Sequence, residues 1–270
     1  MATTTQFGTL LRHWRQARRY SQLDLALQAD ISSKHVSFLE TGRNQPSREM
    51  ILRLTQVMDV PLRDRNLLLN SAGFAPVYEE SGIDSPIVGQ AKEALRRILG
   101  KQEPYPAIVL DAEWNLIQQN RGASALGQFL IPGAPDSGFN VLELLFSPQG
   151  LQPFVVNWEQ LSSVLLMRLL RESTLPGRAR SSRDLLERLE AMPATPRNWK
   201  ELAASYPDGP TVDLILSRNG NRYAFFTTVT TFGTPQDVTL QELRIESYFP
   251  SDDSTRQLCE SWQSNQAVTG

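Results

Sequence analysis

The fold of the amino-terminal part is decided by residues 21–42, which read SQLDLALQADISSKHVSFLETG. Ser21 can accept a hydrogen bond from a free amide at the start of a helix, and Asp24, three residues later, completes a capping box. Ser32 can cap a second helix, and Gly42 supplies the left-handed residue that ends it. The stretch therefore predicts two short helices joined by a tight turn, which is a helix-turn-helix.

The first of these helices is predicted over residues 21–29, and Asp30 stands in the turn that follows it. Aspartate is one of the few side chains that tolerate the left-handed conformation, so we expect Asp30 to keep the turn tight. The side chains that recur at helical spacing, and are expected to face inward, are Leu23, Ala26, Leu27, Val36 and Leu39.

Helical patterns on both sides of this pair complete a small all-α domain. Before the pair, five side chains share one face of a first helix: Phe7, Leu10, Leu11, Trp14 and Arg18. After it, Ser47 caps a helix over 47–58, and Pro61 opens another over 61–71. Five helices within about 75 residues predict one compact domain.

The two parts of the chain differ in charge. Residues 1–75 carry 10 Lys and Arg against 6 Asp and Glu, a net of +4, whereas residues 76–270 carry 17 against 23, a net of −6. The whole-chain pI of about 5.8 therefore averages a basic and an acidic part. A basic helix-turn-helix domain is the electrostatic pattern of a DNA-binding unit.

The pattern of residues 21–47 resembles the XRE-type, phage-repressor-like class of helix-turn-helix regulators. The matching positions are Ser21-Gln22, Ala26, Ile31-Ser32, Val36-Ser37, Glu40, Gly42-Arg43 and Pro46-Ser47. In that family the glutamine at the start of the first helix of the pair bonds a DNA phosphate, which implies this role for Gln22. Asp30 is the one departure, because the family usually has glycine there.

The candidate DNA contacts follow from the geometry of a recognition helix in the major groove. Side chains at its start and one turn later would meet base edges, and Lys34 is the candidate for a guanine. The base-contact candidates are Ser33, Lys34, Ser37 and Phe38, while Ser32 lies at the helix start, and Arg43 and Asn44 in the next loop could contact phosphates. The alternative is that Ser33 and Ser37 are ordinary helix-surface residues.

The chain is long enough for a second domain. Residues 73–86, GFAPVYEESGIDSP, combine breakers with acids and show no periodicity, as a connector does. We therefore predict a DNA-binding domain over 1–75, a linker over 76–86 and a second domain over 87–270. A helix over 87–99 is expected to bury one side, either on the second domain or on another subunit, and that side is made of Ile87, Ala91, Ala94, Leu95 and Ile98.

The second domain reads as α+β. Residues 107–120 predict strand, acidic turn and strand, followed by a helix over 122–129, and this resembles the opening of a PAS domain. Three later strands are predicted over 211–216, 223–232 and 242–249, with Arg-Asn-Gly-Asn as a hairpin turn between the first two. Intervening helices are predicted over 141–146, 158–171 and 182–192. The expected result is a five-stranded antiparallel sheet with helices covering one face.

Longer strings resemble the MmyB-like branch of XRE regulators over nearly the whole chain. They are FLETGR at 38–43, PSREM at 46–50, EPYP at 103–106, VNW at 156–158, TTVTTFGTP at 227–235 and IESYFP at 245–250. The resemblance implies a PAS-like, ligand-binding second domain that controls DNA binding. It also implies a two-fold homodimer on a near-palindromic site.

A pocket between sheet and helices would combine apolar walls with a few polar anchors. The candidate walls are Trp114, Phe154, Trp158, Leu165, Leu169, Phe225 and Thr227, and the candidate anchors are Asn120, Asn157 and Arg168. Any of the walls could instead be ordinary core. Arg168 interrupts an apolar run and could bind a carboxylate, or could lie on the solvent face paired with Glu172. The hypothesis is a lipophilic ligand, with a fatty-acid-like carboxylate as one candidate.

The residues argue against an enzyme. The chain has two histidines, His13 and His35, both in the DNA-binding part, so the second domain lacks a histidine base or metal ligand. No Gly-rich phosphate loop follows a strand, and we expect no cofactor and no metal. The remaining alternative is a second domain that only dimerises or recruits a protein.

The sequence predicts a cytoplasmic protein. No stretch reaches the roughly 20 apolar residues of a membrane span, and the opening residues Met-Ala-Thr-Thr-Thr lack an export pattern. The single Cys259 cannot form an internal disulfide, which fits a reducing compartment.

Overall fold

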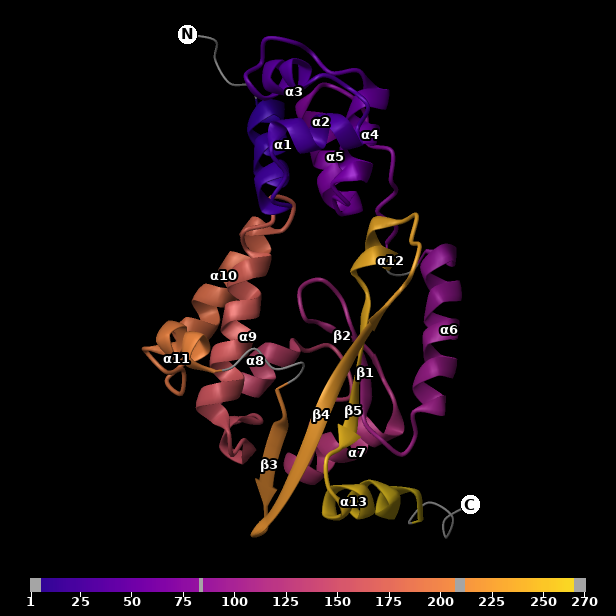
Figure 1. Cartoon of the computed structure of the whole chain (residues 1–270). Helices are drawn as coiled ribbons and strands as arrows, with labels where there is room; N and C mark the ends of the chain where they lie inside the picture. Colours follow the sequence, from indigo (N-terminus) through magenta and orange to yellow (C-terminus); the bar gives the residue numbers. More distant parts are fainter. Residues whose placement is uncertain (1–5, 83–84, 207–211, 265–270) are drawn as a thin grey trace. The chain divides into compact units, whose positions relative to one another are not determined.

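A computed structural model describes residues 6–82, 85–206 and 212–264 of the chain (Figure 1). The chain divides into two compact units. Unit 1 comprises Met1–Ser81 with two later segments, Leu175–Gly177 and Thr234–Gln241, and unit 2 comprises the rest. The chain therefore leaves unit 2 for unit 1 twice after residue 82 and returns each time.

Unit 1 contains the predicted helix-turn-helix. Its helices are α1 (Gln6–Ala17), α2 (Gln22–Gln28), α3 (Ser33–Glu40), α4 (Arg48–Val57) and α5 (Leu62–Ser71). The capping box is present, because the Asp24 amide donates to Ser21 Oγ at 3.0 Å and the Ser21 amide donates to Asp24 Oδ2 at 2.9 Å. Ser32 and Ser47 cap α3 and α4 through their side chains. Local capping chemistry thus starts three of these helices.

The turn between α2 and α3 confirms the expectation for Asp30, whose φ is +50°. Gly42 follows the end of α3 with a φ of +72°. Both residues hold the left-handed conformation that closes a short helix.

The buried face of α2 differs from the predicted one. Leu23 and Leu27 are 58% and 71% exposed, whereas Leu25 and Ala26 are buried, so the prediction for Leu23 and Leu27 was wrong. The helix has only seven residues, and leucines at alternate positions put apolar groups on more than one side. Spacing alone therefore did not choose the face that packs. Val36 and Leu39 are buried as predicted.

The two late segments of unit 1 are held by hydrogen bonds to its helices and to the chain after them. The Leu62 amide donates to Gln241 Oε1 at 2.7 Å, and the Gly177 amide donates to Asp64 Oδ1 at 2.7 Å. The Val238 amide, at the start of α12 (Val238–Glu242), donates to the Glu79 carbonyl at 2.8 Å. These bonds place segments from late in the sequence in the same unit as the helix-turn-helix.

Unit 2 is built on the predicted five-stranded antiparallel sheet, in the order β2-β1-β5-β4-β3. The strands are β1 (Ala107–Leu110), β2 (Leu116–Gln119), β3 (Leu214–Arg218), β4 (Asn221–Thr231) and β5 (Arg244–Pro250). Asn219 and Gly220 both have positive φ, as a two-residue hairpin turn between β3 and β4 requires. The predicted strand over 211–216 begins at Thr211, which lies outside the described residues. Early and late strands thus meet at the β1–β5 pair, in a PAS-like arrangement.

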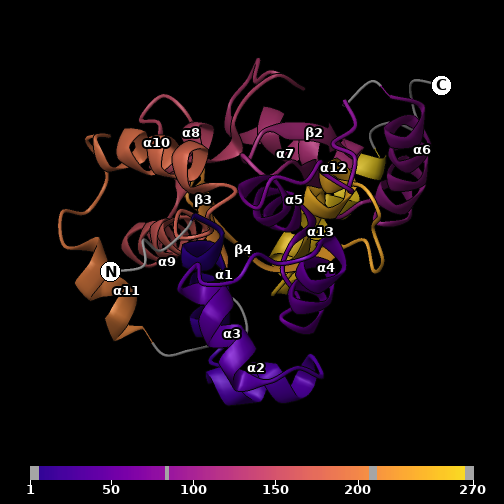
Figure 2. The same ribbon diagram turned by 90° about the horizontal axis from the view of Figure 1, so that it is seen from above.

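Helices lie on both sides of this sheet (Figures 1 and 2). On one side are α8 (Val141–Phe146), α9 (Trp158–Glu172) and α10 (Ala179–Glu190), with α11 (Trp199–Ser205) beside α9; on the other is α6 (Pro86–Lys101). The remaining elements are α7 (Arg121–Leu130), a 3-10 turn at Gln152–Phe154, and α13 (Asp253–Ser264). The sequence did not predict α11, α12 or α13.

The buried stripe of α6 is shifted from the predicted one. Val88 and Leu99 are buried together with the predicted Ala91 and Leu95, as their exposed fractions show. Ile87 and Ile98 are 47% and 51% exposed, and Ala94 is exposed as well, so the prediction for these three was wrong. Among the described residues no helix is long and apolar enough to cross a membrane.

Candidate functional site

The first turn of α3 presents exposed polar side chains. Ser33 and Lys34 are exposed, while Ser37 and Phe38, one turn later, are half-buried. Two cations approach the Phe38 ring: Lys34 Nζ lies 5.5 Å and Arg43 Cζ 5.6 Å from its centroid. Cation–π contact of this kind restrains long side chains that remain in water. The exposed side of α3 and the loop after it therefore combine one aromatic ring with two positive groups.

The edges of this surface are polar as well. Ser32 Oγ accepts from the His35 amide at 3.1 Å, so the hydroxyl serves first as a helix cap. Arg43 and Asn44 are exposed in the loop after α3. Asn44 Nδ2 lies 3.4 Å from His35 Nδ1. All of these groups come from one continuous segment of unit 1.

Gln22 is oriented by a buried ion pair that the sequence did not predict. Arg15 Nε donates to Glu40 Oε1 at 2.6 Å, and Arg15 Nη2 donates to Glu40 Oε2 at 3.1 Å. Gln22 Nε2 donates to the same Glu40 Oε2 at 2.8 Å. The two side chains of the pair are 10% and 4% exposed, which makes this a largely buried fork-to-fork contact. It ties α1, α3 and the start of α2 together.

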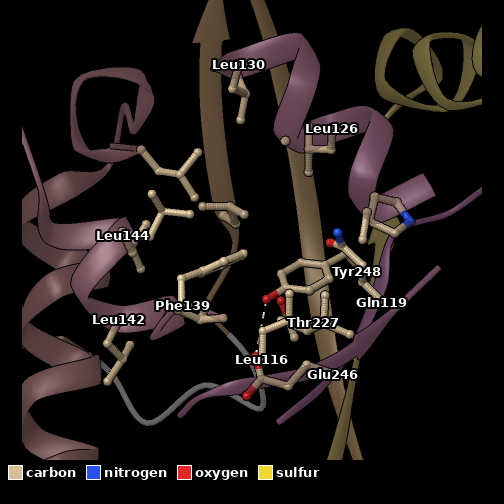
Figure 3. Close-up of a pocket in the computed structure, with 18 of the residues that line it drawn as sticks. Leu116, Gln119, Leu126, Leu130, Phe139, Leu142, Leu144, Thr227, Glu246 and Tyr248 are labelled. Atoms are coloured by element: carbon tan, nitrogen blue, oxygen red, sulfur yellow. Dashed lines mark hydrogen bonds between the residues drawn. The ribbon is translucent and has the colours of Figure 1, made fainter. Parts of the chain in front are cut away.

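Unit 2 contains a cavity of about 300 Å³ between the sheet and its helices (Figure 3). That is at the lower end of the size range of small-molecule sites. The apolar lining includes Ile108 of β1, Leu116 of β2, Leu126 and Leu130 of α7, Phe139 before α8, Leu142, Leu144 and Leu145 of α8, Leu161 and Leu165 of α9, Leu214 and Leu216 of β3, and Val229 of β4. Polar groups in the lining are few, and Gln128 and Asp136 among them are exposed.

The structure places four of the ten predicted pocket residues on this cavity. They are Trp114, Leu165, Arg168 and Thr227. The other six lie outside the lining. Asn120 caps α7, and Asn157 forms hydrogen bonds with the backbone at Asp213 and Ile215. Trp158 packs on Phe146, Phe154 lies under Arg218, and Leu169 and Phe225 belong to the core. The polar side chains of Asn120 and Asn157 are used in holding the backbone.

The sequence reading missed the polar wall formed by β5. Glu246 and Tyr248 alternate along that strand with Ile245 and Ser247 and point into the cavity, together with Leu116 of β2 (Figure 3). Alternation of this kind usually marks a solvated face. One feature of the sequence could have indicated it. Arg168 breaks an apolar run, and a buried arginine needs a partner of opposite charge, which Glu246 can supply.

Glu246 and Arg168 belong to a network of four charges beside Trp114. Arg168 Nη1 donates to Glu246 Oε1 at 3.4 Å, and Arg168 Nε lies 3.5 Å from Glu172 Oε1. Arg244 Nη1 donates to that same Glu172 oxygen at 3.3 Å. Arg168 thus makes the Glu172 pair that the sequence offered as one alternative, and it lines the cavity as well.

Trp114 is the centre of this network. Its indole N–H donates to Glu172 Oε2 at 3.2 Å, and Cζ of Arg168 and Arg244 lies 4.5 and 3.8 Å from its ring centroid. Trp114 has a φ of +68°, a left-handed conformation that is rare for a bulky residue. Such strain persists where the surroundings hold it, and it often accompanies a functional site.

Two pKa shifts follow from these surroundings. Burial, followed by the nearby Arg168 charge, lowers the pKa of Arg244 to about 10. Burial and the neighbouring Glu246 carboxylate raise the pKa of Tyr248 well above its ordinary value. Arg244 therefore stays cationic at neutral pH, and Tyr248 stays a neutral phenol that donates to Glu246 Oε2 at 3.2 Å.

Both units match families of known proteins. Residues 91–261 match the family described as the MmyB-like transcription regulator ligand binding domain, and residues 6–68 match a helix-turn-helix domain. Neither is an enzyme family. No curated protein matches the chain.

One similar solved structure is an RNA-binding light-oxygen-voltage receptor, with 11% identity and a TM-score of 0.29. The match covers 100% of this chain, which spans 65% of the length of that one. A likeness of this size supports no conclusion about function.

The ligand-binding-domain match alone extends over more than half of the chain and contains the whole cavity lining. The helix-turn-helix match contains α1 to α5 up to Leu68. The chain belongs to the family of MmyB-like transcription regulators, with a DNA-binding helix-turn-helix followed by a ligand-binding domain.

Proposed function

We propose that the protein is a transcription regulator whose operator binding is controlled by a lipophilic small molecule held in the unit 2 cavity. The observation that carries this proposal is the largely apolar lining of a cavity of about 300 Å³ in a chain that also contains a helix-turn-helix. Apolar walls with a few polar groups are the usual composition of a small-molecule site.

The DNA-binding surface that we propose is the start of α3 with its flanks. Ser33, Lys34, Ser37 and Phe38 would meet base edges, because the first turns of a recognition helix enter the major groove. Contacts to the DNA backbone are assigned to the other four predicted residues, Gln22, Ser32, Arg43 and Asn44. The Glu40 contact supports the assignment of Gln22, since it holds the amide at the start of α2.

Lys34→Ala is expected to weaken discrimination at one base pair of each half-site by about 1–3 kcal/mol. Lys34 is exposed on the first turn of α3, with its ammonium restrained near Phe38. The measurement is base preference, obtained by selecting bound sites from a randomised DNA pool. Gln22→Ala and Arg43→Ala are the controls, because loss of a phosphate contact weakens binding to all sequences alike. An unchanged preference in Lys34→Ala would refute the assignment of α3 as the reading helix.

The ligand that we propose has a long hydrocarbon chain like that of a fatty acid. Leucine and phenylalanine side chains from both the sheet and the helices face the cavity and could enclose such a chain (Figure 3). Arg168 is the cation that a carboxylate head group would meet.

The proposed working form is a homodimer of the XRE type, acting in the cytoplasm on half-sites about one helical turn apart. The net charge of residues 1–75 supports contact with DNA phosphates. Ligand binding would change the affinity for DNA only as far as the ligand prefers one of two states of the protein.

The first test is operator binding by fluorescence anisotropy, with DNA from upstream of the protein's own gene. The protein is measured as purified, after removal of apolar ligands, and after long-chain fatty acids, alcohols or amides are added back. A change in DNA affinity on removal, reversed on addition, is the expected result. Unchanged affinity would refute control by such a ligand and would favour a second domain that dimerises or recruits a protein.

A further inference from the structure

The polar wall of the cavity is dominated by a hydrogen-bond acceptor. The Glu246 side chain is 8% exposed and lines the cavity from β5. Its contacts with Arg168 and Tyr248 measure 3.4 and 3.2 Å, both long for bonds to a carboxylate. A carboxylate can accept about four hydrogen bonds, so Glu246 retains accepting capacity toward the cavity. A buried acceptor of this kind favours a ligand that donates to it.

The cation on the same wall is already neutralised. Arg168 lies between Glu246 and Glu172, and Arg244 pairs with Glu172 from the other side. The two arginines and two glutamates have formal charges that sum to zero. An anionic ligand that reached Arg168 would therefore also meet Glu246, with a charge of the same sign in a poorly solvated site. A cationic ligand would meet the two arginines in the same way.

Tyr248 adds a group that can both donate and accept a hydrogen bond. Its phenol stays neutral, donates to Glu246, and keeps oxygen lone pairs that can accept. Arg168 can donate as well. The wall as a whole thus presents an acceptor in Glu246 and donors in Arg168, next to the apolar lining.

We propose that the cavity selects a long-chain ligand with an uncharged head group that both donates and accepts hydrogen bonds, such as an alcohol or a primary amide, and that Glu246 excludes the carboxylate anion. This inference rests on the proposed function and narrows it, since the hydrocarbon chain of a fatty acid is kept and its ionised head group is not. Glu246 is thereby a specificity-determining residue.

The test compares dodecanol, dodecanamide and dodecanoate by isothermal titration calorimetry on the full chain, below the concentrations at which they aggregate. The three share one hydrocarbon chain, so their differences report the head group. The two neutral compounds are expected to bind at least about tenfold more tightly than dodecanoate. Because this comparison uses the unaltered protein, it needs no variant to fold.

Glu246→Gln is expected to bring dodecanoate to within about threefold of the neutral pair, because the repelling charge is gone while an acceptor remains. The matched control is Glu143→Gln. That residue lies on α8 of the same unit, pairs with Arg188 at 2.7 Å and stands outside the cavity lining, so its variant should keep the original order. Heat unfolding of both variants checks that each is folded.

Tightest binding of dodecanoate by the unaltered protein would overturn this inference and leave the proposed function standing. An unchanged preference in folded Glu246→Gln would also overturn it. Failure of all three compounds, and of the neutral apolar dye Nile red, to bind would overturn the proposed function and this inference together.

Discussion

Replacing Arg15 with alanine is expected to destabilise the helix-turn-helix of unit 1 by about 3–5 kcal/mol, which is a large part of a small domain's stability. The reason is the carboxylate that remains. Glu40 is 4% exposed on its side chain and, among the described residues, would keep only the Gln22 amide as a side-chain partner. A buried charge without its counterion costs far more than the pair contributed.

The measurement is amide hydrogen exchange of α1 and α3, since the chain has two units and a single unfolding curve would mix them. Arg12→Ala is the control, because Arg12 is exposed on the same helix. It should leave protection unchanged. Equal protection in Arg15→Ala and Arg12→Ala would show that the pair does not hold the unit together.

A paired replacement separates folding from DNA binding. Arg15→Met combined with Glu40→Met removes both charges, and well-packed apolar substitutes for a buried pair are often neutral for stability. Protection of α1 and α3 should largely return. Gln22 would still lack the oxygen that orients it, so we expect operator affinity to stay below that of the unaltered protein.

Local signals predicted the helix-turn-helix well and its packing less well. The capping box at Ser21 and Asp24 and the left-handed Asp30 are decided by neighbouring residues, and both predictions are confirmed. Whether the side chains of Leu23 and Leu27 are buried or exposed depends on which side of α2 the neighbouring helices cover. That choice is made by contacts between segments far apart in the sequence.

Local sequence signals predicted the residues of the cavity even less well than the packing of α2. Alternating patterns predicted the strands, but eight helices and strands contribute to the lining together with several loops, and the contribution of each depends on the orientation of the others. Six of the ten predicted lining residues are used elsewhere, as caps, backbone anchors or core. Glu246 was overlooked because a charge that alternates along a strand usually faces water.

The Arg178–Glu242 pair is expected to be required for the ligand's effect on DNA affinity. Arg178 directly follows the segment Leu175–Gly177, and Glu242 directly follows Thr234–Gln241, which are the two late segments of unit 1. Their side chains, 20% and 8% exposed, approach to 3.1 Å within unit 2. One ion pair therefore joins the two points at which the chain re-enters unit 2.

Two residues that line the cavity lie within ten residues of this ion pair along the sequence. Glu246 on β5 is four residues after Glu242, and Arg168 on α9 is ten residues before Arg178. Glu172 and Arg244 lie between them and contact each other at 3.3 Å. A ligand that shifts Arg168 or Glu246 would thus act on charges that adjoin both re-entry points.

Arg178→Ala and Glu242→Ala should each reduce the ligand-dependent change in operator affinity to less than about twofold, compared with the 5- to 150-fold range typical of coupled sites. Ligand affinity, measured by calorimetry, should change little, because neither residue lines the cavity. Anisotropy titrations with and without ligand give the coupling directly. Exchanging the two residues, Arg178→Glu with Glu242→Arg, should restore it.

Arg188→Ala is the matched control for this prediction. Arg188 lies on α10, in the same unit, and makes a 2.7 Å pair with Glu143 whose side chains are 55% and 39% exposed. Exposed pairs contribute little, so the coupling should survive its loss. Full coupling in both Arg178→Ala and Glu242→Ala would show that the ligand acts on DNA affinity by another route. Loss of coupling in those two variants alone, with recovery in the exchanged pair, would show that this contact has two states. Ligand binding and DNA binding would then each shift the equilibrium between them.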